Sequence, residues 1–216
     1  MNLIFDLDGT LLNTIDDLWA SVNHALAQYS LPSRSISEIR QFLGNGIASL
    51  VHKSMPTDDA ELESRVFATF RDHYMAHSLD HTRPYDGITD MLRQCKVHGH
   101  RTAIVSNKTH AAVQELHQRF FTGLIDTAIG EQPDIPRKPA PDMVHLAMHQ
   151  LGATPDTSVY IGDSEVDLAT ARNAHLPCIS VAWGFRDEPF LIQQGAAPII
   201  HNPNELLSIL QQFASS

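Results

Sequence analysis

The chain has 216 residues, of which 43% are hydrophobic and 19% charged, a composition that fits one globular domain or one domain with a smaller insertion. This composition excludes disordered, collagenous and coiled-coil chains. The formal net charge of −10 argues against a nucleic-acid partner, because an acidic surface repels phosphates.

Cysteine usage and the start of the chain predict a cytoplasmic protein. Cys95 and Cys178 form no CxxC pair, so we expect neither a disulfide framework nor a zinc knuckle. The chain reaches Asp6 without a preceding basic flank, which is not typical of a signal peptide. No apolar run approaches the roughly 20 residues that cross a bilayer. We therefore expect no membrane partner, while the sequence leaves the oligomeric state open.

The first predicted element is a buried strand over Leu3–Phe5, which ends at an abrupt polar turn over residues 6–10. The following segment, residues 14–83, contains helix-like stretches such as Ile15–Tyr29 and Thr57–Leu79, with no convincing strand between them. We interpret this segment as a small helical domain inserted into the chain. Residues 1–13 and 84–216 then form the core domain.

Strands and helices alternate in the rest of the chain. Each predicted strand is a mostly apolar run rich in β-branched residues, as expected for parallel strands covered on both faces. The alternation predicts an α/β fold with a doubly wound, Rossmann-like parallel sheet. In chain order the elements are helix Ile88–Val97, strand Thr102–Val105, helix Thr109–Phe120, helix Pro141–Leu151, strand Val159–Ile161, helix Ser164–Ala174, strand Cys178–Ala182 and helix Pro203–Phe213.

Several chemically active side chains directly follow the predicted strands. In an open α/β sheet the ligand site lies outside the carboxyl ends of the strands, which here precede Asp6, Asp8, Ser106, Lys108 and Asp163. Three carboxylates at one edge repel one another unless a cation neutralises them, and oxygen ligands favour Mg²⁺. We therefore predict a magnesium site formed by Asp6, Asp8 and Asp163.

The same side chains suit phosphoryl transfer. Ser106 and Lys138 can bind the oxygens of a phosphate, which carry the charge of the transition state. Asp6 or Asp8 can attack phosphorus and form an acyl phosphate, while its neighbour acts first as acid and then as base. These residue types alone do not decide which carboxylate attacks.

Four segments, in this order, resemble the motifs of the haloacid dehalogenase-like hydrolase superfamily. They span nearly the whole chain, and each follows or opens the appropriate kind of element. The segments are Asp6-Leu7-Asp8-Gly9-Thr10-Leu11, Ser106-Asn107-Lys108, Lys138-Pro139-Ala140-Pro141-Asp142 and Gly162-Asp163-Ser164-Glu165-Val166-Asp167.

The resemblance implies a role for one or two side chains of each motif. It also implies that a bound Mg²⁺ takes the backbone carbonyl of Asp8. The implied roles are nucleophile for Asp6, general acid and base for Asp8, phosphate binding for Ser106 and Lys138, magnesium binding for Asp163, and orientation of Lys138 or a metal-bound water for Asp167.

Within this superfamily the chain is similar to the phosphoglycolate phosphatase branch, whose small cap closes over a phosphorylated acid. The similarity lies in residues 42–47, in Asn107-Lys108 and in Trp183-Gly184-Phe185. Glycines let backbone N–H groups approach an anion. The chain departs from the family where it has Asn13 instead of an acid and His175 instead of a glycine. The resemblance adds Thr10, Gly44, Asn45, Gly46 and Asn107 to the candidate substrate-binding residues.

The predicted function is Mg²⁺-dependent hydrolysis of a small phosphorylated metabolite, with 2-phosphoglycolate as the first candidate. A phosphosugar mutase shares this fold and chemistry, but such mutases commonly carry an apolar residue at the position of Thr10. A dehalogenase needs neither the second aspartate nor a metal. A phospho-receiver signalling domain also combines acidic residues, Mg²⁺, a hydroxyl and a lysine on a doubly wound sheet, yet it needs no helical insertion.

The chain has 13 histidines, which we consider as metal ligands because histidine commonly binds metals. His73, His77 and His81 are spaced i, i+4 and i+8, and His145 and His149 repeat the i, i+4 spacing. Neither set contains the glutamate of the His-Glu-x-x-His zinc motif. We therefore expect both sets to lie on solvated helix faces.

Overall fold

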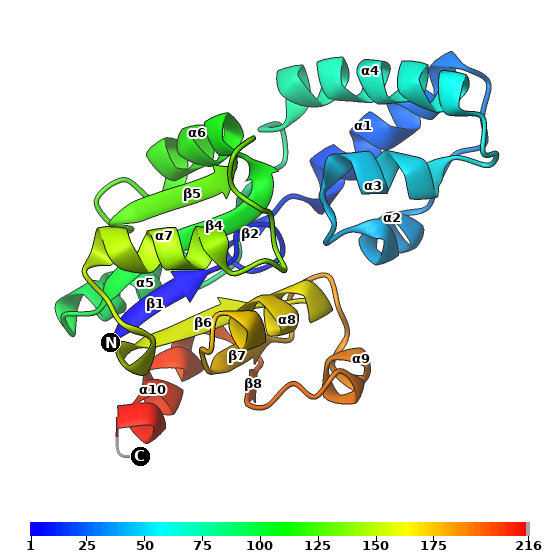
Figure 1. The fold of residues 1–216 in the computed structure, drawn as a ribbon. Coiled ribbons are helices and arrows are strands. Elements are labelled where there is room, and N and C mark those ends of the chain that lie inside the picture. Colours follow the sequence, from blue (N-terminus) through cyan, green and yellow to red (C-terminus); the bar gives the residue numbers. More distant parts are fainter. Residues whose placement is uncertain (215–216) are drawn as a thin grey trace. The chain divides into compact units, whose positions relative to one another are not determined.

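The computed structural model describes residues 1–214 and divides them into two compact units (Figure 1). The first unit comprises residues 1–12 together with the chain from residue 84 onward, and the second comprises residues 13–83. The chain crosses between them over β2 (Leu12–Asn13) and β3 (Arg83–Pro84), which pair as a two-stranded sheet.

The first unit contains a six-stranded sheet in the order β5-β4-β1-β6-β7-β8, in which every pairing is parallel. The predicted α/β fold is therefore confirmed. Two edge strands, β5 and β8, were absent from the prediction. The strands are β1 (Asn2–Phe5), β4 (Arg101–Thr109), β5 (Thr127–Glu131), β6 (Ser158–Gly162), β7 (Cys178–Val181) and β8 (Ile199–Ile200).

Strand β1 lies at the centre of the sheet because its three apolar residues can all be buried there. Leu3, Ile4 and Phe5 are at most 1% exposed, and β1 pairs with β4 on one side and β6 on the other. The carboxyl ends of these three strands consequently meet at one edge of the sheet. The polar residues that follow them are brought together by this register.

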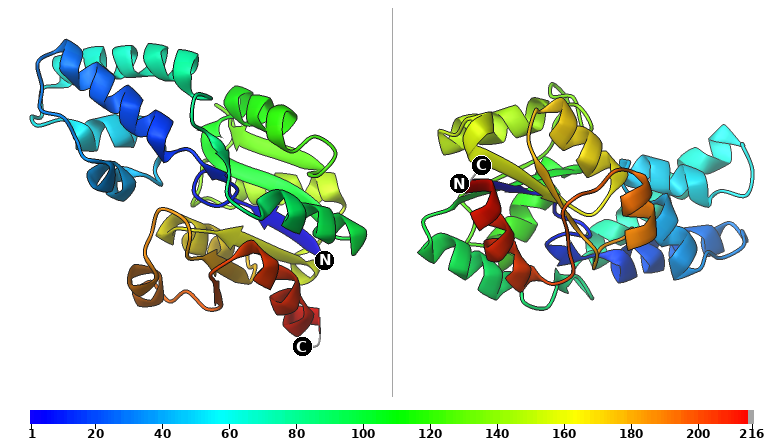
Figure 2. Two further views of the ribbon diagram at one scale, coloured as in Figure 1. Left: turned by 180° about the vertical axis from the view of Figure 1, so that it is seen from behind. Right: turned by 90° about the horizontal axis from the view of Figure 1, so that it is seen from below.

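Helices cover both faces of the sheet (Figure 2). Helices α7 and α8 share one hydrophobic core against the strands, while α5 lies on the opposite face with α10. Two short 3₁₀ turns, Pro155–Thr157 and Pro203–Glu205, precede β6 and α10. The helices are α5 (Ile88–Val97), α6 (His110–Phe120), α7 (Asp142–Leu151), α8 (Glu165–Asn173), α9 (Glu188–Gln193) and α10 (Leu206–Ala214).

The second unit is entirely helical apart from its ends, and α1 and α4 pack along each other within it (Figure 1). The predicted helices over Ile15–Tyr29 and Thr57–Leu79 correspond to α1 and α4. Helix α2 begins at a capping box in which Ser35 and Glu38 satisfy each other's backbone N–H groups. The four helices are α1 (Ile15–Gln28), α2 (Ile36–Phe42), α3 (Gly46–Ser54) and α4 (Ala60–His77).

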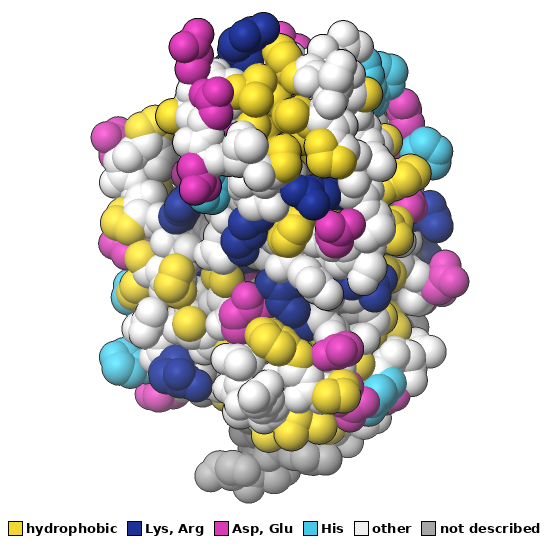
Figure 3. Space-filling model, turned by 90° about the vertical axis from the view of Figure 1, so that its right-hand side faces the viewer, with side chains coloured by type: hydrophobic (Ala, Val, Ile, Leu, Met, Phe, Trp, Pro, Cys, Tyr) yellow, Lys and Arg dark blue, Asp and Glu magenta, His cyan; other side chains and the backbone are white. Residues whose placement is uncertain are grey.

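On the face drawn in Figure 3, acidic and basic side chains are interspersed with small hydrophobic areas, and histidines lie among them. None of the helices within residues 1–214 is both long enough and apolar enough to cross a membrane.

Candidate active site

Three buried carboxylates converge at the carboxyl edge of the sheet. Asp6 follows β1, Asp163 follows β6, and Asp167 lies in the first turn of α8. One carboxylate oxygen from each lies within 4.8 Å of the others, and all three side chains are buried. The sheet register thus concentrates three acidic groups in one place that water barely reaches.

Glycines make this convergence possible. A Cβ atom at Gly9 would lie 2.4 Å from Oδ2 of Asp163, and one at Gly184 would lie 2.3 Å from the Cβ of Asp163. A Cβ atom at Gly162 would lie 2.4 Å from Asp167. Any side chain at these positions collides with a carboxylate, so the backbone packs closely against both aspartates only because it carries none.

Lys138 is the cation of this cluster. Its ammonium group donates to Oδ1 of Asp6 at 2.6 Å, to Oδ1 of Asp167 at 2.8 Å and to the hydroxyl of Tyr160 at 3.1 Å. An ammonium group has three protons, so these three acceptors use all of them. Lys138 is therefore held in a fixed position between two carboxylates.

Burial raises the pKa values of two of these carboxyl groups. Desolvation raises the pKa of Asp6 to about 7, although Lys138 opposes the shift. Burial, followed by the charges of Asp167 and Asp6, raises the pKa of Asp163 well above its ordinary value. Although burial alone would lower the pKa of Lys138, the carboxylates raise it well above its ordinary value. One cation therefore faces three carboxylates, and a divalent cation fits the remaining negative charge.

Asp167 already has hydrogen-bond partners for both of its oxygens. Its Oδ2 accepts from the backbone N–H groups of Asp163 and Ser164 and from the Ser164 hydroxyl at 2.6 Å. Its Oδ1 accepts from Lys138 and from the Tyr160 hydroxyl at 3.1 Å. Five donors occupy this carboxylate, which leaves Asp6 and Asp163 as the more available metal ligands of the three.

Asp163 is oriented by two donors from different loops. The backbone N–H of Phe185, in the loop after β7, donates to Oδ2 at 2.7 Å, and the Thr10 hydroxyl donates to Oδ1 at 3.3 Å. The Trp183 indole donates to the Thr10 carbonyl at 3.0 Å. The loop after β7 therefore supports both Asp163 and the turn after β1.

Asp8 is not one of the three clustered carboxylates and pairs with Lys108. The Lys108 ammonium lies 2.9 Å from Oδ1 of Asp8, and the two side chains are 8% and 20% exposed. Lys108 is in β4, which runs beside β1, so adjacent strands supply the pair. Although only one residue lies between them in the chain, Asp8 pairs with Lys108 whereas Asp6 pairs with Lys138.

Ser106 and Asn107 both lie in β4 and are buried. The Ser106 oxygen accepts from the Lys108 N–H at 3.1 Å, which leaves its own proton for donation. The Asn107 amide makes two hydrogen bonds to the Lys138 backbone, one to its N–H at 2.8 Å and one to its carbonyl at 3.1 Å. Asn107 therefore fixes the loop that carries the lysine.

Two glycines flank Asn45 at the start of α3 in the second unit. Gly44 and Gly46 have φ values of 113° and 79°, in the region that favours glycine, and Asn45 between them is the N-cap of α3. The Asn45 side chain makes no cap hydrogen bond. These three residues belong to the unit of residues 13–83, whereas the carboxylates belong to the other.

Two residues beside these carboxylates, Tyr160 and Arg186, were not predicted from the sequence. Tyr160 is a buried strand residue whose hydroxyl bridges Lys138 and Asp167, and its sequence context suggests only a core position. Arg186 makes a bidentate ion pair with Glu165, at 2.7 and 2.9 Å. The only sequence signal for Arg186 is its position just after the Trp-Gly-Phe segment.

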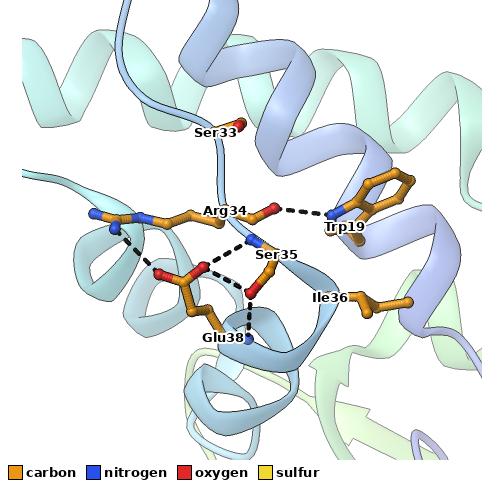
Figure 4. Close-up of a pocket in the computed structure, with 6 residues that line it drawn as sticks. All are labelled: Trp19, Ser33, Arg34, Ser35, Ile36 and Glu38. Carbon is orange, nitrogen blue, oxygen red and sulfur yellow. Dashed lines mark hydrogen bonds and ion pairs between the residues drawn. The ribbon is translucent and has the colours of Figure 1, made fainter.

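A shallow pocket of about 550 Å³ lies in the second unit (Figure 4). The Trp19 indole donates to the Arg34 carbonyl at 2.9 Å on its wall. The pocket contains none of the predicted site residues, so we do not assign it to the active site. Its lining residues are Trp19, Ser33, Arg34, Ser35, Ile36 and Glu38.

Comparison with known proteins places this arrangement among hydrolases. The model of the haloacid dehalogenase-like hydrolase family matches residues 3–181. A phosphoglycolate phosphatase from Cereibacter sphaeroides is 34% identical over 192 residues, which cover 87% of each protein. A phosphoglycolate phosphatase from Caulobacter vibrioides is 31% identical over 93% of this chain and 86% of its own length.

Solved structures agree with this result. A protein from Lactobacillus delbrueckii subsp. bulgaricus superposes with a TM-score of 0.90 and 35% identity over 95% of each chain. A haloacid dehalogenase-like family protein from Streptococcus pneumoniae, 23% identical, superposes with a TM-score of 0.88 over 97% of each chain and shows the same fold.

Proposed function

The chain belongs to the haloacid dehalogenase-like hydrolases, and from this premise we propose that it is a Mg²⁺-dependent phosphatase of small phosphomonoesters. The observation that supports this most strongly is the convergence of Asp6, Asp163 and Lys138 at one sheet edge. We propose 2-phosphoglycolate as the first candidate substrate, because the curated relatives described above are phosphoglycolate phosphatases.

Asp6 is the proposed nucleophile. Its carboxylate oxygen attacks phosphorus, the bond from phosphorus to the substrate oxygen breaks, and an aspartyl phosphate forms on Asp6. Water then attacks the same phosphorus, which releases inorganic phosphate and restores the carboxylate. The hydrogen bond from Lys138 to Oδ1 supports this role because it orients the Asp6 carboxylate.

Asp8 is the proposed general acid and base. In the first step it donates a proton to the departing oxygen, and in the second it removes a proton from the attacking water. The ion pair with Lys108 supports separate roles for the two aspartates, since it holds Asp8 in a different environment from Asp6. The protons balance over the two steps, because Asp8 gives one proton in the first step and receives one from water in the second.

Lys138, Ser106 and Thr10 are the residues that we propose stabilise the phosphate, Lys138 through its charge. Lys138 carries positive charge next to the carboxylate that would receive the phosphoryl group, and Ser106 retains a hydroxyl proton for a phosphate oxygen. Asn107 contributes by holding the Lys138 backbone. Removing any of these groups should weaken stabilisation of the transition state.

Mg²⁺ is the proposed metal, held by the side chains of Asp6 and Asp163 and by the backbone carbonyl of Asp8. All three donors are oxygens, and the buried carboxylates carry more negative charge than Lys138 neutralises. When bound, the ion neutralises charge between the nucleophilic carboxylate and the phosphate. Asp167 serves instead to orient Lys138.

Residues 14–83 are the proposed cap domain over a core of residues 1–13 and 84–216. The division of the chain into two compact units supports this assignment. We propose that the backbone of Gly44, Asn45 and Gly46 contacts the acidic end of the substrate, because both glycines have positive φ values, as in the backbone turns that commonly form anion-binding concavities.

A panel of phosphomonoesters tests the proposal. The purified chain is incubated with 2-phosphoglycolate, sugar monophosphates and nucleoside monophosphates, with Mg²⁺ or with EDTA, and released phosphate is measured. We expect release that depends on Mg²⁺ and is fastest with a small phosphorylated acid. Isomerised sugar phosphate without free phosphate would indicate a mutase, and no turnover of any compound would contradict the phosphatase assignment.

A further inference from the structure

Lys108 lies beside the proposed general acid, and its backbone is fixed in the sheet. The residue is next to last in β4, and its N–H donates to the Ser106 hydroxyl oxygen at 3.1 Å. A Cβ atom at Gly130 of β5 would lie 2.6 Å from the Lys108 carbonyl oxygen, so the glycine lets β5 pack directly against this backbone. The Lys108 side chain is 8% exposed and starts from a firmly held strand end.

Lys108 and Lys138 place positive charge at different carboxylates. The Lys138 ammonium lies 2.6 Å from Oδ1 of Asp6, whereas the Lys108 ammonium lies 2.9 Å from Oδ1 of Asp8. In the proposed reaction Asp6 attacks phosphorus and Asp8 protonates the departing oxygen. Lys138 is then beside the phosphoryl group, and Lys108 is beside the leaving group. An acidic leaving group carries a charge that matches Lys108, and a neutral alcohol does not.

The covalent structure of a 2-hydroxy acid brings its carboxylate close to this lysine. In 2-phosphoglycolate, two bonds separate the ester oxygen from the carboxylate carbon. Proton donation from Asp8 brings the ester oxygen to about 2.7 Å from the Asp8 carboxyl group, so the substrate carboxylate lies close to Asp8 as well. The Lys108 ammonium is at hydrogen-bond distance from the same carboxyl group. Since an ammonium group has three protons, it can bond Asp8 and the substrate together.

We propose that Lys108 binds the carboxylate of the leaving group and thereby selects phosphate esters of 2-hydroxy acids over those of neutral alcohols. This inference rests on the proposed function, in which Asp8 meets the departing oxygen. Hydrogen bonds from an ammonium group to a carboxylate are stronger than those between neutral groups. The backbone of residues 44–46, proposed above for the same end of the substrate, has no net charge. Lys108 supplies the positive charge that this backbone lacks.

A role confined to Asp8 would give a different result. If Lys108 only held Asp8 in place, its removal would slow every alkyl phosphate whose departing oxygen needs a proton. If Lys108 also binds the carboxylate, its removal slows the ester of the acid more than the ester of a neutral alcohol. A comparison of two substrates in one variant therefore separates the two roles.

The test measures kcat/KM for 2-phosphoglycolate and for ethyl phosphate in Mg²⁺, with the unmodified chain and with Lys108→Met. Ethyl phosphate has a methyl group where 2-phosphoglycolate has its carboxylate. We expect the ratio of the two values to fall by roughly 10- to 100-fold in Lys108→Met, which is typical of a lost hydrogen bond between charged groups. Lys108→Arg keeps the charge and should retain more of the preference. Because both substrates are measured on one preparation, partial unfolding cancels from the ratio.

Lys96→Met is the matched control, because it removes the same charge from an exposed position on α5. Its ratio should equal that of the unmodified chain. Lys108→Gln provides the same measurement if Lys108→Met does not fold.

Equal losses with both substrates in the Lys108 variant would overturn the inference and leave the phosphatase assignment intact. An equal change of the ratio in Lys96→Met would also overturn it, because the effect would then come from net charge alone. No turnover of any phosphomonoester by the unmodified chain would overturn the proposed function and this inference together.

Discussion

The ammonium group of Lys138 lies 2.6 Å from Oδ1 of Asp6, and both side chains are buried. The lysine reaches Asp6 from a loop 132 residues further along the chain. A second buried carboxylate, Asp167, lies 2.8 Å from the same nitrogen. The position of the proposed nucleophile therefore depends on a lysine that two carboxylates share.

Replacement of Lys138 by Met should damage both stability and turnover. Removing the cation leaves Asp6 and Asp167 buried without their partner, which typically costs about 3–5 kcal/mol of the free energy of unfolding. Loss of one positioned charge should also lower kcat by roughly 10²–10³-fold. Urea unfolding and phosphate release measure the two effects. A Lys138→Met protein with normal stability would contradict the buried network.

Gly184→Ala should weaken Mg²⁺ binding. The added Cβ would lie 2.3 Å from the Cβ of Asp163, so either this carboxylate or the Phe185 N–H that orients it must move. We expect a higher Mg²⁺ concentration for half-maximal phosphate release, together with weaker Mg²⁺ binding by calorimetry.

Gly195→Ala is the control for this substitution. Gly195 has a φ of 85° and no neighbour within 4 Å of an added Cβ. Its replacement should cost about 1 kcal/mol through backbone strain, with no change in Mg²⁺ affinity. Equal effects of the two substitutions on Mg²⁺ affinity would contradict the role assigned to Gly184.

Asp8→Asn should affect substrates according to their leaving groups. Asparagine cannot give a proton to the departing oxygen, so alkyl phosphates should lose roughly 10²–10⁴-fold in rate. An aryl phosphate such as p-nitrophenyl phosphate has a leaving group that departs without a proton and should lose much less in a single-turnover measurement. Equal losses for both substrate types would argue against Asp8 as the general acid.

Lowering the pH should destabilise the packing of His73, whose ring stacks on those of His24 and His77. The pKa of His73 in the folded state is below its ordinary value of 6.5. The unfolded chain therefore binds this proton first, and the free energy of unfolding falls as the pH drops from above 6.5 through the folded-state pKa. Urea unfolding at several pH values should show a smaller fall for His73→Gln. Identical pH profiles would refute this contribution.

His175→Gly should stabilise the protein. His175 has a φ of 57° just after α8, and its side chain is exposed. Glycine adopts this left-handed conformation without the steric cost that a side chain brings. We expect a gain of about 1 kcal/mol in the free energy of unfolding, measured with urea. A loss of stability would indicate that the histidine side chain makes a compensating contact.

The central strands could be predicted because each is a continuous, mostly apolar run. In Leu3–Phe5, for example, all three side chains are buried. The edge strands could not. Strand β5 contains a glycine, Gly130, that allows close approach to the Lys108 backbone, and β8 has only two residues. Neither segment carries enough pattern to signal a strand, and both depend on the neighbouring strand for their formation.

The candidate site was predictable to the extent that its residues follow strands. Asp6 and Asp163 converge because the sheet register brings the ends of β1 and β6 together, whereas Lys138 reaches them from a loop that Asn107 holds. The contacts that orient them were not predictable. Lys108 pairs with Asp8 and His24 stacks on His73 through tertiary packing, and neither pair is separated by a spacing that sequence periodicity can detect.

The most direct test of the central claim is phosphate release from 2-phosphoglycolate by the unmodified chain and by Asp6→Asn, both in Mg²⁺. Circular dichroism verifies that the variant is folded. Asparagine keeps the shape of Asp6 but lacks the charge that attacks phosphorus, so we predict that turnover falls to background. Turnover by folded Asp6→Asn near that of the unmodified chain would show that Asp6 is not the nucleophile.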